Sequence, residues 1–245
     1  DGVTRNGNDD YYEVMQYACK APTVNNDNIN KTLIIMIPNT EDYGGVTYMW
    51  DDGSAIAYCP MSDYGYPLDF RGVIQHEAGG HGFGKLGDEY IYHNAFIQAC
   101  KCTCCPHAYE LMSAQSKGWF QNLSLTGKMS DVPWRDFIFH EKYSGFVDIF
   151  EGGYMHSRGV FRSEQNSCMN NEIPYYSTIS RYEIVKRIME YAGEPFSFDK
   201  FVENDIVEAV AETAATKGGN IGMDSRSASM NSHEPVFMGE RKTLR

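Results

Sequence analysis

The pattern of hydrophobic and polar positions in the first quarter of the chain predicts one helix followed by three short strands. Residues 11–20 carry apolar side chains at helical spacing, and the apolar run Leu33–Ile37 is typical of a buried strand. Two more apolar runs, at 46–50 and 54–59, flank an Asp-Gly turn signal, so we expect them to pair as neighbouring strands. The pattern therefore predicts a mixed sheet in this part of the chain.

Three helices are predicted further along. Asp69 is a suitable N-cap for a helix that continues to Glu77. Ser180 and Glu183 have the reciprocal spacing of a capping box, and an apolar stripe at helical spacing follows them. A last helix is expected over residues 198–215.

The distribution of aromatic, cysteine and glycine residues predicts the domain organisation. Residues 94–150 alternate short aromatic segments with Cys, Pro and Gly, which is typical of a large insertion. From Gly218 onward the chain is rich in Gly, Ser and Asn and has few apolar side chains to bury. We expect one folded domain over residues 1–217 and a flexible C-terminal tail over residues 218–245.

The composition excludes several classes of protein. With 245 residues and 42% hydrophobic side chains, the chain can bury a sizeable core. Its formal net charge of -12 argues against binding to nucleic acid or anionic lipid, which needs clustered Lys and Arg. No apolar run approaches the roughly 20 residues of a membrane-spanning helix. The sequence starts at Asp1 without a basic and apolar leader, so we expect a secreted or extracytoplasmic protein whose signal peptide has been removed, or one anchored at the cell surface through a preceding region.

Seven cysteines allow at most three disulfide bonds within the chain, and four of the seven lie in the segment 100–105. That segment lacks a second Cys or His pair at the spacing of a zinc finger. We therefore expect disulfides or free thiols there, with metal binding as the less favoured alternative.

The segment His76-Glu77-Ala78-Gly79-Gly80-His81 carries the strongest chemical signal in the sequence. In the metallopeptidase pattern H-E-x-x-H, two histidines one helical turn apart face one zinc ion, and the glutamate reaches the water bound to it. Here the gap between the histidines is one residue longer. In a regular α-helix a five-residue step rotates by roughly 500°, which would turn His81 about 140° away from His76.

A π-bulge removes this conflict, because one wider turn brings residues i and i+5 to the same face of a helix. Gly79 and Gly80 each disfavour a regular helix by about 1 kcal/mol relative to Ala, which favours unusual backbone geometry at this place. The sequence therefore predicts a π-turn that lets His76 and His81 bind one metal ion, with Glu77 beside it as the general base. The alternative is that both histidines are ordinary polar helix residues.

The chain after His81 contains three glycines, at 82, 84 and 87, followed by an acidic pair. These glycines allow the chain to leave the helix and bring a third ligand back to the metal. Asp88 is the preferred third ligand, and Glu89 and His93 are the alternatives, since either could complete a tetrahedral zinc site with one open position. Zn²⁺ suits this donor set better than Ca²⁺, which prefers oxygen ligands.

Together these residues resemble a family of bacterial peptidases that is grouped with the clostridial IgA metallopeptidase and is called peptidase family M64. The resemblance spans most of residues 40–190, because four segments follow the order and spacing of the family. They are Tyr43-Gly44-Gly45, Gln75–Tyr90, Glu151–Tyr154 with Gly159–Arg162, and Ser167-Cys168-Met169. The longer histidine gap is similar to Bacteroides-type members, whereas clostridial members have the regular gap.

The resemblance implies a metzincin-like zinc peptidase of the α+β (α/β) class, with a twisted mixed β-sheet, an active-site helix and a Met-containing turn beneath the metal. Met169 is the matching methionine. Metzincins at large have the third ligand six residues after the second histidine, where this chain has Gly87, and the family pattern shifts it to Asp88. The family's domain usually opens with a strand and helix that the sequence before residue 30 lacks, which would make this chain a fragment or a processed form.

The expected function is that of a zinc-dependent endopeptidase that acts on protein or peptide substrates. His76, His81 and Asp88 would hold Zn²⁺ with one position open for water. Glu77 would take a proton from the attacking water and pass it to the leaving amine.

Two more segments supply candidate site residues. Tyr175 or Tyr176, after the methionine, could donate a hydrogen bond to the oxyanion of the scissile carbonyl, or could be ordinary packed aromatics. The segment Tyr43-Gly44-Gly45 and the strand after it could bind an extended substrate by edge pairing.

The alternative from another class is a catalytically inactive binding module or adhesin on a peptidase-like scaffold, which the longer histidine gap motivates. The retention of Glu77 argues against it, because a structural zinc ion needs no general base. Metal content measured together with hydrolysis distinguishes the two.

Overall fold

The structure is a computed structural model that describes residues 11–41, 44–97, 106–207 and 235–244. It combines helices with two mixed β-sheets, so the α+β class expected from the sequence is confirmed, although the resemblance implied a single sheet. In this part of the chain no helix is long and apolar enough to cross a bilayer.

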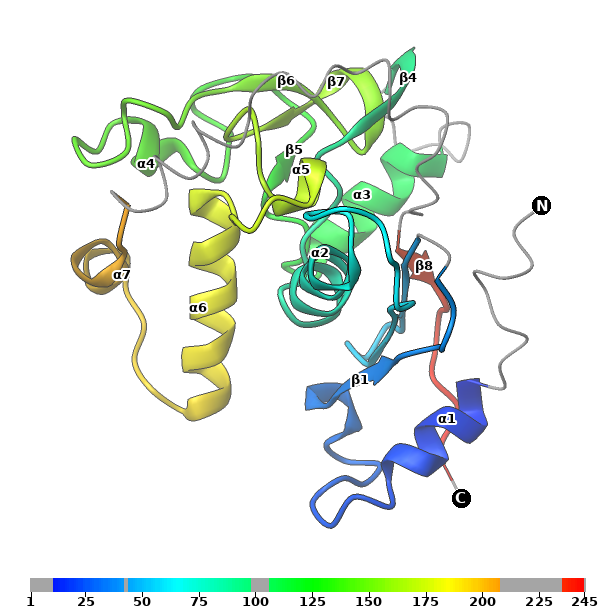
Figure 1. Cartoon of the computed structure of the whole chain (residues 1–245). Coiled ribbons are helices and arrows are strands. Elements are labelled where there is room, and N and C mark those ends of the chain that lie inside the picture. Colours follow the sequence, from blue (N-terminus) through cyan, green and yellow to red (C-terminus); the bar gives the residue numbers. More distant parts are fainter. Residues whose placement is uncertain (1–10, 42–43, 98–105, 208–234, 245) are drawn as a thin grey trace. The chain divides into compact units, whose positions relative to one another are not determined.

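Two compact units divide the chain, and each has its own sheet (Figure 1). Unit 1 comprises residues 1–83 and 229–245, and unit 2 comprises residues 84–228. The boundary between the two units falls inside the single domain expected over residues 1–217. Residues 94–150, expected as an insertion, contribute strands and helices to unit 2.

The sheet of unit 1 has the strand order β1-β3-β2-β8. Its members are β1 (Leu33–Met36), β2 (Val46–Met49), β3 (Ala55–Tyr58) and β8 (Val236–Phe237). β2 and β3 form the antiparallel pair expected around the Asp-Gly turn, while β1 and β8 add to it in parallel. β2 and β3 are buried throughout, but β1 is an edge strand and only partly buried, which corrects the expectation of a buried strand there.

The core of unit 1 packs the N-terminal helices against this sheet. α1 (Tyr11–Ala18) confirms the first predicted helix and buries Met15, and the short 3-10 helix η1 (Ile29–Lys31) buries Ile29. The other buried members of this cluster are Val46, Tyr48, Trp50, Ile56, Tyr58 and Leu244.

The C-terminal residues belong to this core, which corrects the expectation of a flexible tail for residues 235–244. β8 pairs with β2, and Leu244 is buried. The Leu244 backbone N–H donates to Asn26 Oδ1 over 2.9 Å, and Arg241 forms an ion pair with Asp52 at 2.7 Å. A two-residue strand gives no periodic pattern in a sequence, so nothing in the polar composition of the tail indicated this packing.

A continuous helix of unit 1 carries the His-Glu segment. α2 (Phe70–Ile74) begins at the predicted N-cap Asp69, whose carboxylate accepts a hydrogen bond from the Arg71 backbone N–H at 3.0 Å. It runs directly into the π-helix η2 (Gln75–Phe83). Both helices pack against residues of the sheet through one apolar cluster. Its members are Leu33, Ala57, Cys59, Leu68, Phe70, Val73, Ile74 and Ala78.

The sheet of unit 2 is built around β7, which pairs in parallel with β4 and antiparallel with β5 and β6. Its members are β4 (Ile91–Phe96), β5 (Leu123–Ser124), β6 (Phe150–Gly153) and β7 (Met155–Arg162). Register shifts interrupt the ladders of β7 with β4 and with β6.

Helices complete unit 2 within the described residues. They are α3 (Pro106–Ser116), α4 (Arg135–Ile138), α5 (Cys168–Asn171), α6 (Thr178–Ala192) and α7 (Phe198–Asn204). An aromatic-rich core holds α4, α6 and α7 together, with Phe137, Tyr143, Ile179 and Phe201 among its buried members.

Two helix boundaries in unit 2 differ from the sequence prediction. α6 begins at Thr178, because Ser177 rather than Ser180 is the N-cap and accepts from the Ser180 backbone N–H at 3.4 Å. α7 ends at Asn204, and residues 208–215 of the helix predicted there lie outside the described residues.

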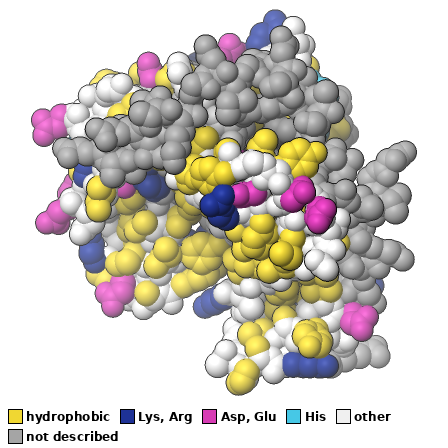
Figure 2. All heavy atoms as spheres, in the orientation of Figure 1, with side chains coloured by type: hydrophobic (Ala, Val, Ile, Leu, Met, Phe, Trp, Pro, Cys, Tyr) yellow, Lys and Arg dark blue, Asp and Glu magenta, His cyan; other side chains and the backbone are white. Residues whose placement is uncertain are grey.

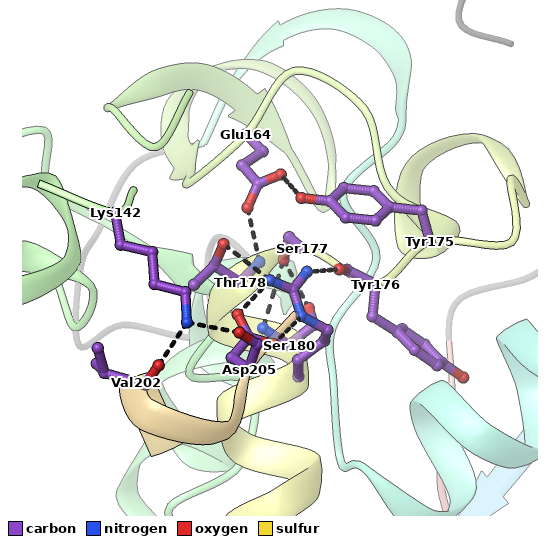
Figure 3. A network of polar contacts seen from close by, with 10 residues as sticks. Lys142, Glu164, Tyr175, Tyr176, Ser177, Thr178, Ser180, Val202 and Asp205 are labelled. Atoms are coloured by element: carbon purple, nitrogen blue, oxygen red, sulfur yellow. Dashed lines mark hydrogen bonds and ion pairs between the residues drawn. The ribbon is translucent and has the colours of Figure 1, made fainter. Parts of the chain in front are cut away.

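An ion pair fixes the end of α7. Asp205 has an extended backbone, and its carboxylate accepts two hydrogen bonds from the Arg181 guanidinium, at 2.8 and 2.9 Å (Figure 3). Lys142 donates to the carbonyl oxygens of Val202 and Asp205. Because bidentate pairs of this kind fix geometry as well as charge, the chain leaves the helix at Asp205.

An apolar hollow of about 460 Å³ is lined by residues of α6, α7 and the segments beside them. Its apolar lining residues are Val185, Met189, Phe196, Phe201 and Ile206. Figure 2 shows hydrophobic side chains reaching the surface over α6, where Ile188 is 47% exposed. Part of the apolar surface of α6 therefore stays in contact with solvent.

Replacement of Leu244 by Ala tests the packing of the C-terminal segment. We expect the free energy of unfolding to fall by about 2 to 3 kcal/mol, because a buried leucine is truncated at a site that can collapse only in part. Urea denaturation followed by circular dichroism measures this change. Ile37→Ala is the matched control, since Ile37 is 52% exposed and its truncation should change the stability by less than about 0.5 kcal/mol. Equal effects of the two substitutions would contradict the packing of Leu244.

Candidate metal centre

The helix that carries His76 and His81 has the wide turn expected from its sequence. Residues Gln75–Phe83 form the π-helix η2, in which residues five apart share one face. Both imidazoles are buried. The prediction of unusual backbone geometry at the longer histidine gap is therefore confirmed.

The two imidazoles meet at a distance that suits either a direct hydrogen bond or a shared metal ion. His76 Nε2 and His81 Nε2 lie 3.1 Å apart, with the rings nearly perpendicular at an interplanar angle of 74°. Two nitrogen ligands bound tetrahedrally at zinc bond lengths would lie about 3.3 Å apart. The two nitrogens would therefore fit one zinc ion if they moved apart by a few tenths of an ångström.

Glu77 completes the group. A carboxylate oxygen of Glu77 and one ring nitrogen of each histidine lie within 4.8 Å of one another. The Thr47 hydroxyl lies 2.8 Å from Glu77 Oε2 and 3.0 Å from the Glu77 carbonyl oxygen, so it can donate to either of them. This contact fixes the orientation of a carboxylate that is 1% exposed and for which burial without a partner would be costly.

Gly45 makes room for Glu77. A Cβ atom at residue 45 would lie 2.5 Å from Glu77 Cγ and 2.8 Å from Glu77 Oε1, closer than real atoms approach. The absence of a side chain at this place therefore lets β2 lie against the carboxylate. The sequence suggested substrate binding by Tyr43, Gly44 and Gly45. For Gly45 the structure adds a packing role, and Tyr43 lies outside the described residues.

The edge of β2 is not accessible for the substrate pairing that we expected. β8 pairs with β2 at Tyr48 and Met49, on the side away from β3. No partner strand pairs with Val46 and Thr47 on that side among the described residues. Both residues are at most 1% exposed, so the structure does not present this edge for the expected pairing.

Sequence reasoning missed two residues near Glu77, namely Thr47 and Cys59. Burial raises the pKa of the Cys59 thiol, and the negative charge of Glu77 raises it further, so this free cysteine is neutral. The signal for Thr47 was its position as the one aliphatic hydroxyl residue in the apolar run Val46–Trp50. Cys59 gave no comparable signal.

No model of a known protein family matches the sequence, and a search among curated proteins found no significant match. The function is therefore inferred from the geometry of the residues and from the motif resemblance.

The segments that carry the resemblance within unit 2 come together through backbone hydrogen bonds. The Tyr154 N–H donates to the Asp88 carbonyl oxygen at 2.9 Å, and the Glu89 N–H donates to the Met169 carbonyl oxygen at 2.8 Å. Asp88 and Met169 are both fully buried, and Met169 lies in the one-turn helix α5. Residues about 65 and 80 positions apart in the chain thus surround the acidic pair.

The candidate third ligands differ in their surroundings. Glu89 accepts hydrogen bonds from Ser167 Oγ at 2.5 Å and Asn122 Nδ2 at 3.0 Å. Burial raises the pKa of Glu89 to about 7, and these two hydrogen bonds oppose that shift. His93 is exposed on β4. Asp88 belongs to unit 2, and its side chain is buried.

The two candidate tyrosines differ as well. The Tyr175 hydroxyl donates to the Glu164 carboxylate, and the side chain is 5% exposed. Its hydroxyl therefore has a structural partner, which argues against the oxyanion role suggested for it. Tyr176 is half-buried, and its ring points away from Glu164 and Tyr175 (Figure 3).

Replacement of Gly45 by Ala tests the close approach to Glu77. We expect a loss of about 1 to 3 kcal/mol in the free energy of unfolding, because the new methyl group forces Glu77 or β2 to move. Urea denaturation and zinc retention after dialysis are the measurements. Gly65→Ala is the matched control, since a Cβ there meets nothing within 4 Å. An unchanged Gly45→Ala protein would refute the tight contact.

A second prediction concerns pH and Glu89. The folded-state pKa of about 7 lies above the ordinary value of 4.5, so the charged carboxylate is disfavoured in the folded state. The contribution of Glu89 to the free energy of unfolding is therefore most favourable below pH 4.5. About 3 kcal/mol of this contribution is lost as the pH rises from 4.5 through 7. Glu89→Gln should flatten this decline in metal-free protein, measured as urea denaturation between pH 5 and pH 8. The exposed Glu203→Gln is the control, and identical pH profiles for both variants would contradict the prediction.

Proposed function

We propose that this protein is a zinc-dependent endopeptidase with a metzincin-like active site, related to peptidase family M64 and acting outside the cytoplasm. One observation carries the proposal. The two imidazole nitrogens of His76 and His81 face each other at 3.1 Å on a π-helix, with the Glu77 carboxylate in the same group. An ordinary buried histidine pair has no need of a wide helical turn or of a carboxylate fixed beside it.

His76 and His81 would hold Zn²⁺, and we propose Asp88 as the third ligand. The motif resemblance supports Asp88. The surroundings of the alternatives support it as well, because Glu89 already accepts hydrogen bonds from Ser167 and Asn122. Two imidazoles and one carboxylate leave a fourth position open, as catalytic zinc sites do.

Zn²⁺ bound there would supply an acidified water molecule and a Lewis acid for the scissile carbonyl. Glu77 would accept the proton of the attacking water at its carboxylate and then pass it to the leaving amine nitrogen. Thr47 assists by holding Glu77 Oε2 at 2.8 Å, which limits the rotation of the carboxylate during both proton transfers. Tyr176 remains the candidate for a hydrogen bond to the oxyanion.

The substrate would be a protein or peptide in extended conformation. Edge pairing at Val46 and Thr47, in the first half of β2, would require these residues, which are at most 1% exposed, to become accessible when the substrate binds. Gly45, which has no side chain, leaves room for Glu77 beside this strand.

A second candidate is a peptidase-like binding module or adhesin without catalytic activity. The burial of the site favours it, because His76, Glu77 and His81 are at most 1% exposed. A zinc ion without solvent access would only stabilise the fold. Hydrolysis measured together with metal content separates the two functions.

Glu77→Gln is the decisive substitution. The wild-type protein, purified without chelator, should hold about one zinc ion in the site and cleave casein or members of a peptide library. The variant should keep its zinc and lose activity by at least about 100-fold, because the base is removed while the ligands stay. Zinc is measured by inductively coupled plasma mass spectrometry and cleavage by mass spectrometry.

Thr47→Ser and Thr47→Val form a matched pair in the same assay. Serine keeps the hydroxyl that contacts Glu77 and should retain most of the activity, whereas valine removes it. A wild-type protein that binds zinc and cleaves nothing would favour the binding module. A protein that binds no metal through His76 and His81 after reconstitution would overturn the peptidase and leave the binding module as the better account.

A further inference from the structure

Unit 2 gathers a second set of imidazoles that the proposed peptidase does not use. The histidine cluster consists of His93 on β4, His107 in the first turn of α3 and His156 on β7. His93 and His156 are register partners in the parallel pairing of β4 with β7. The rings of His107 and His156 meet edge to face, with centroids 5.1 Å apart.

The hydrogen bond of His156 selects the tautomer that binds metals. Its Nδ1 lies 2.6 Å from the carbonyl oxygen of Tyr154. A carbonyl oxygen only accepts hydrogen bonds, so Nδ1 carries the proton and the lone pair stays on Nε2. Histidines that bind metals almost always donate their other ring N–H to a carbonyl or carboxylate in this way.

The backbone before His156 forms a tight hairpin turn. Tyr154 and Met155 have φ angles of 44° and 65° and lie between the paired residues Gly153 and His156. Positive φ at both central residues is typical of a two-residue type I′ hairpin turn. This turn leads the chain sharply from β6 into β7 and sets the direction of His156.

Burial disfavours the charged form of His156. It lowers the pKa of His156, and the neighbouring His107 and His93 lower it further through charge repulsion. Neutral imidazoles are the form that donates to a metal ion. The lining of the cluster adds a further polar group, since the Tyr154 hydroxyl lies 3.4 Å from Glu110.

We propose that His93, His107 and His156 form a second metal site, which binds a divalent transition ion of the zinc, cobalt or nickel class. Three imidazoles suit these ions better than Mg²⁺ or Ca²⁺, which prefer oxygen ligands. Among the described residues only His76, Glu77 and His81 already have their donor atoms gathered around one point, so the exposed side chain of His93 would have to turn toward the other two rings on metal binding. The bound ion would connect β4, β7 and α3 and leave one coordination position open.

This second site belongs to unit 2, and the His76 and His81 pair belongs to unit 1. The inference goes beyond the proposed peptidase and does not depend on it. Either site could fail without the other.

Cobalt binding to the full chain tests the second site. The background variant carries His76→Ala together with Cys→Ser at positions 100, 102, 104 and 105, which removes the first site and the neighbouring thiols. We expect it to bind one equivalent of Co²⁺, with visible absorption bands of a nitrogen-ligated ion, in titrations followed by calorimetry and spectroscopy. His107→Ala and His156→Ala should each weaken this binding by at least about tenfold.

His140→Ala is the matched control, because His140 packs on Tyr143 and Phe198, away from the cluster, and it should leave the cobalt affinity unchanged. His93→Ala provides an exposed position whose loss does not threaten folding. If the background variant does not fold, the wild-type stoichiometry is compared with that of His93→Ala and should fall by one equivalent. The proposal is wrong if no cobalt binds in the folded background, or if none of the three substitutions changes the affinity.

Discussion

The candidate centre depends on how closely the π-helix packs on its sheet. A regular helix would turn His81 away from His76, and the wide turn of η2 brings them to 3.1 Å instead. Two glycines make the packing possible. A Cβ on Gly82 would lie 2.6 Å from Leu33 Cδ1, and one on Gly45 would lie 2.5 Å from the Glu77 side chain. The position of the imidazoles is thus set by close contact between helix and strands, and helix propensity has little influence on it.

Buried charged groups in both units have hydrogen-bond partners, as their desolvation requires. In unit 1 the Glu77 carboxylate has the Thr47 hydroxyl. In unit 2 Arg181 and Asp205 form a bidentate pair, and Glu89 is held by side chains of residues far away in the chain. Glu77 alone among these carboxylates belongs to a group with two facing imidazoles. That group distinguishes the carboxylate that could act as a base from the structural ones.

Local sequence signals predicted much of the secondary structure. The helix at 11–20, the hairpin around the Asp-Gly turn, the Asp69 cap and the wide turn at the histidine gap all depend on residues close in the chain, and the structure has each of them. Predictions that required long-range contacts were less successful. The end of α7 is decided by the ion pair of Asp205 with Arg181, and residues 235–244 are held by a strand and a leucine that pack on distant parts of unit 1.

The sequence by itself determined the donor set and its unusual spacing, because the offset of the histidines is fixed by the chain and the glycines between them permit a wide helical turn. It could not reveal that Thr47 and Gly45 contact the carboxylate of Glu77, since strand register and sheet packing bring them there across about 30 residues. Nor could it assemble His93, His107 and His156, which come from three separate elements. Side chains separated by tens of residues share a site only when the fold buries them together, and that burial is a property of the tertiary structure.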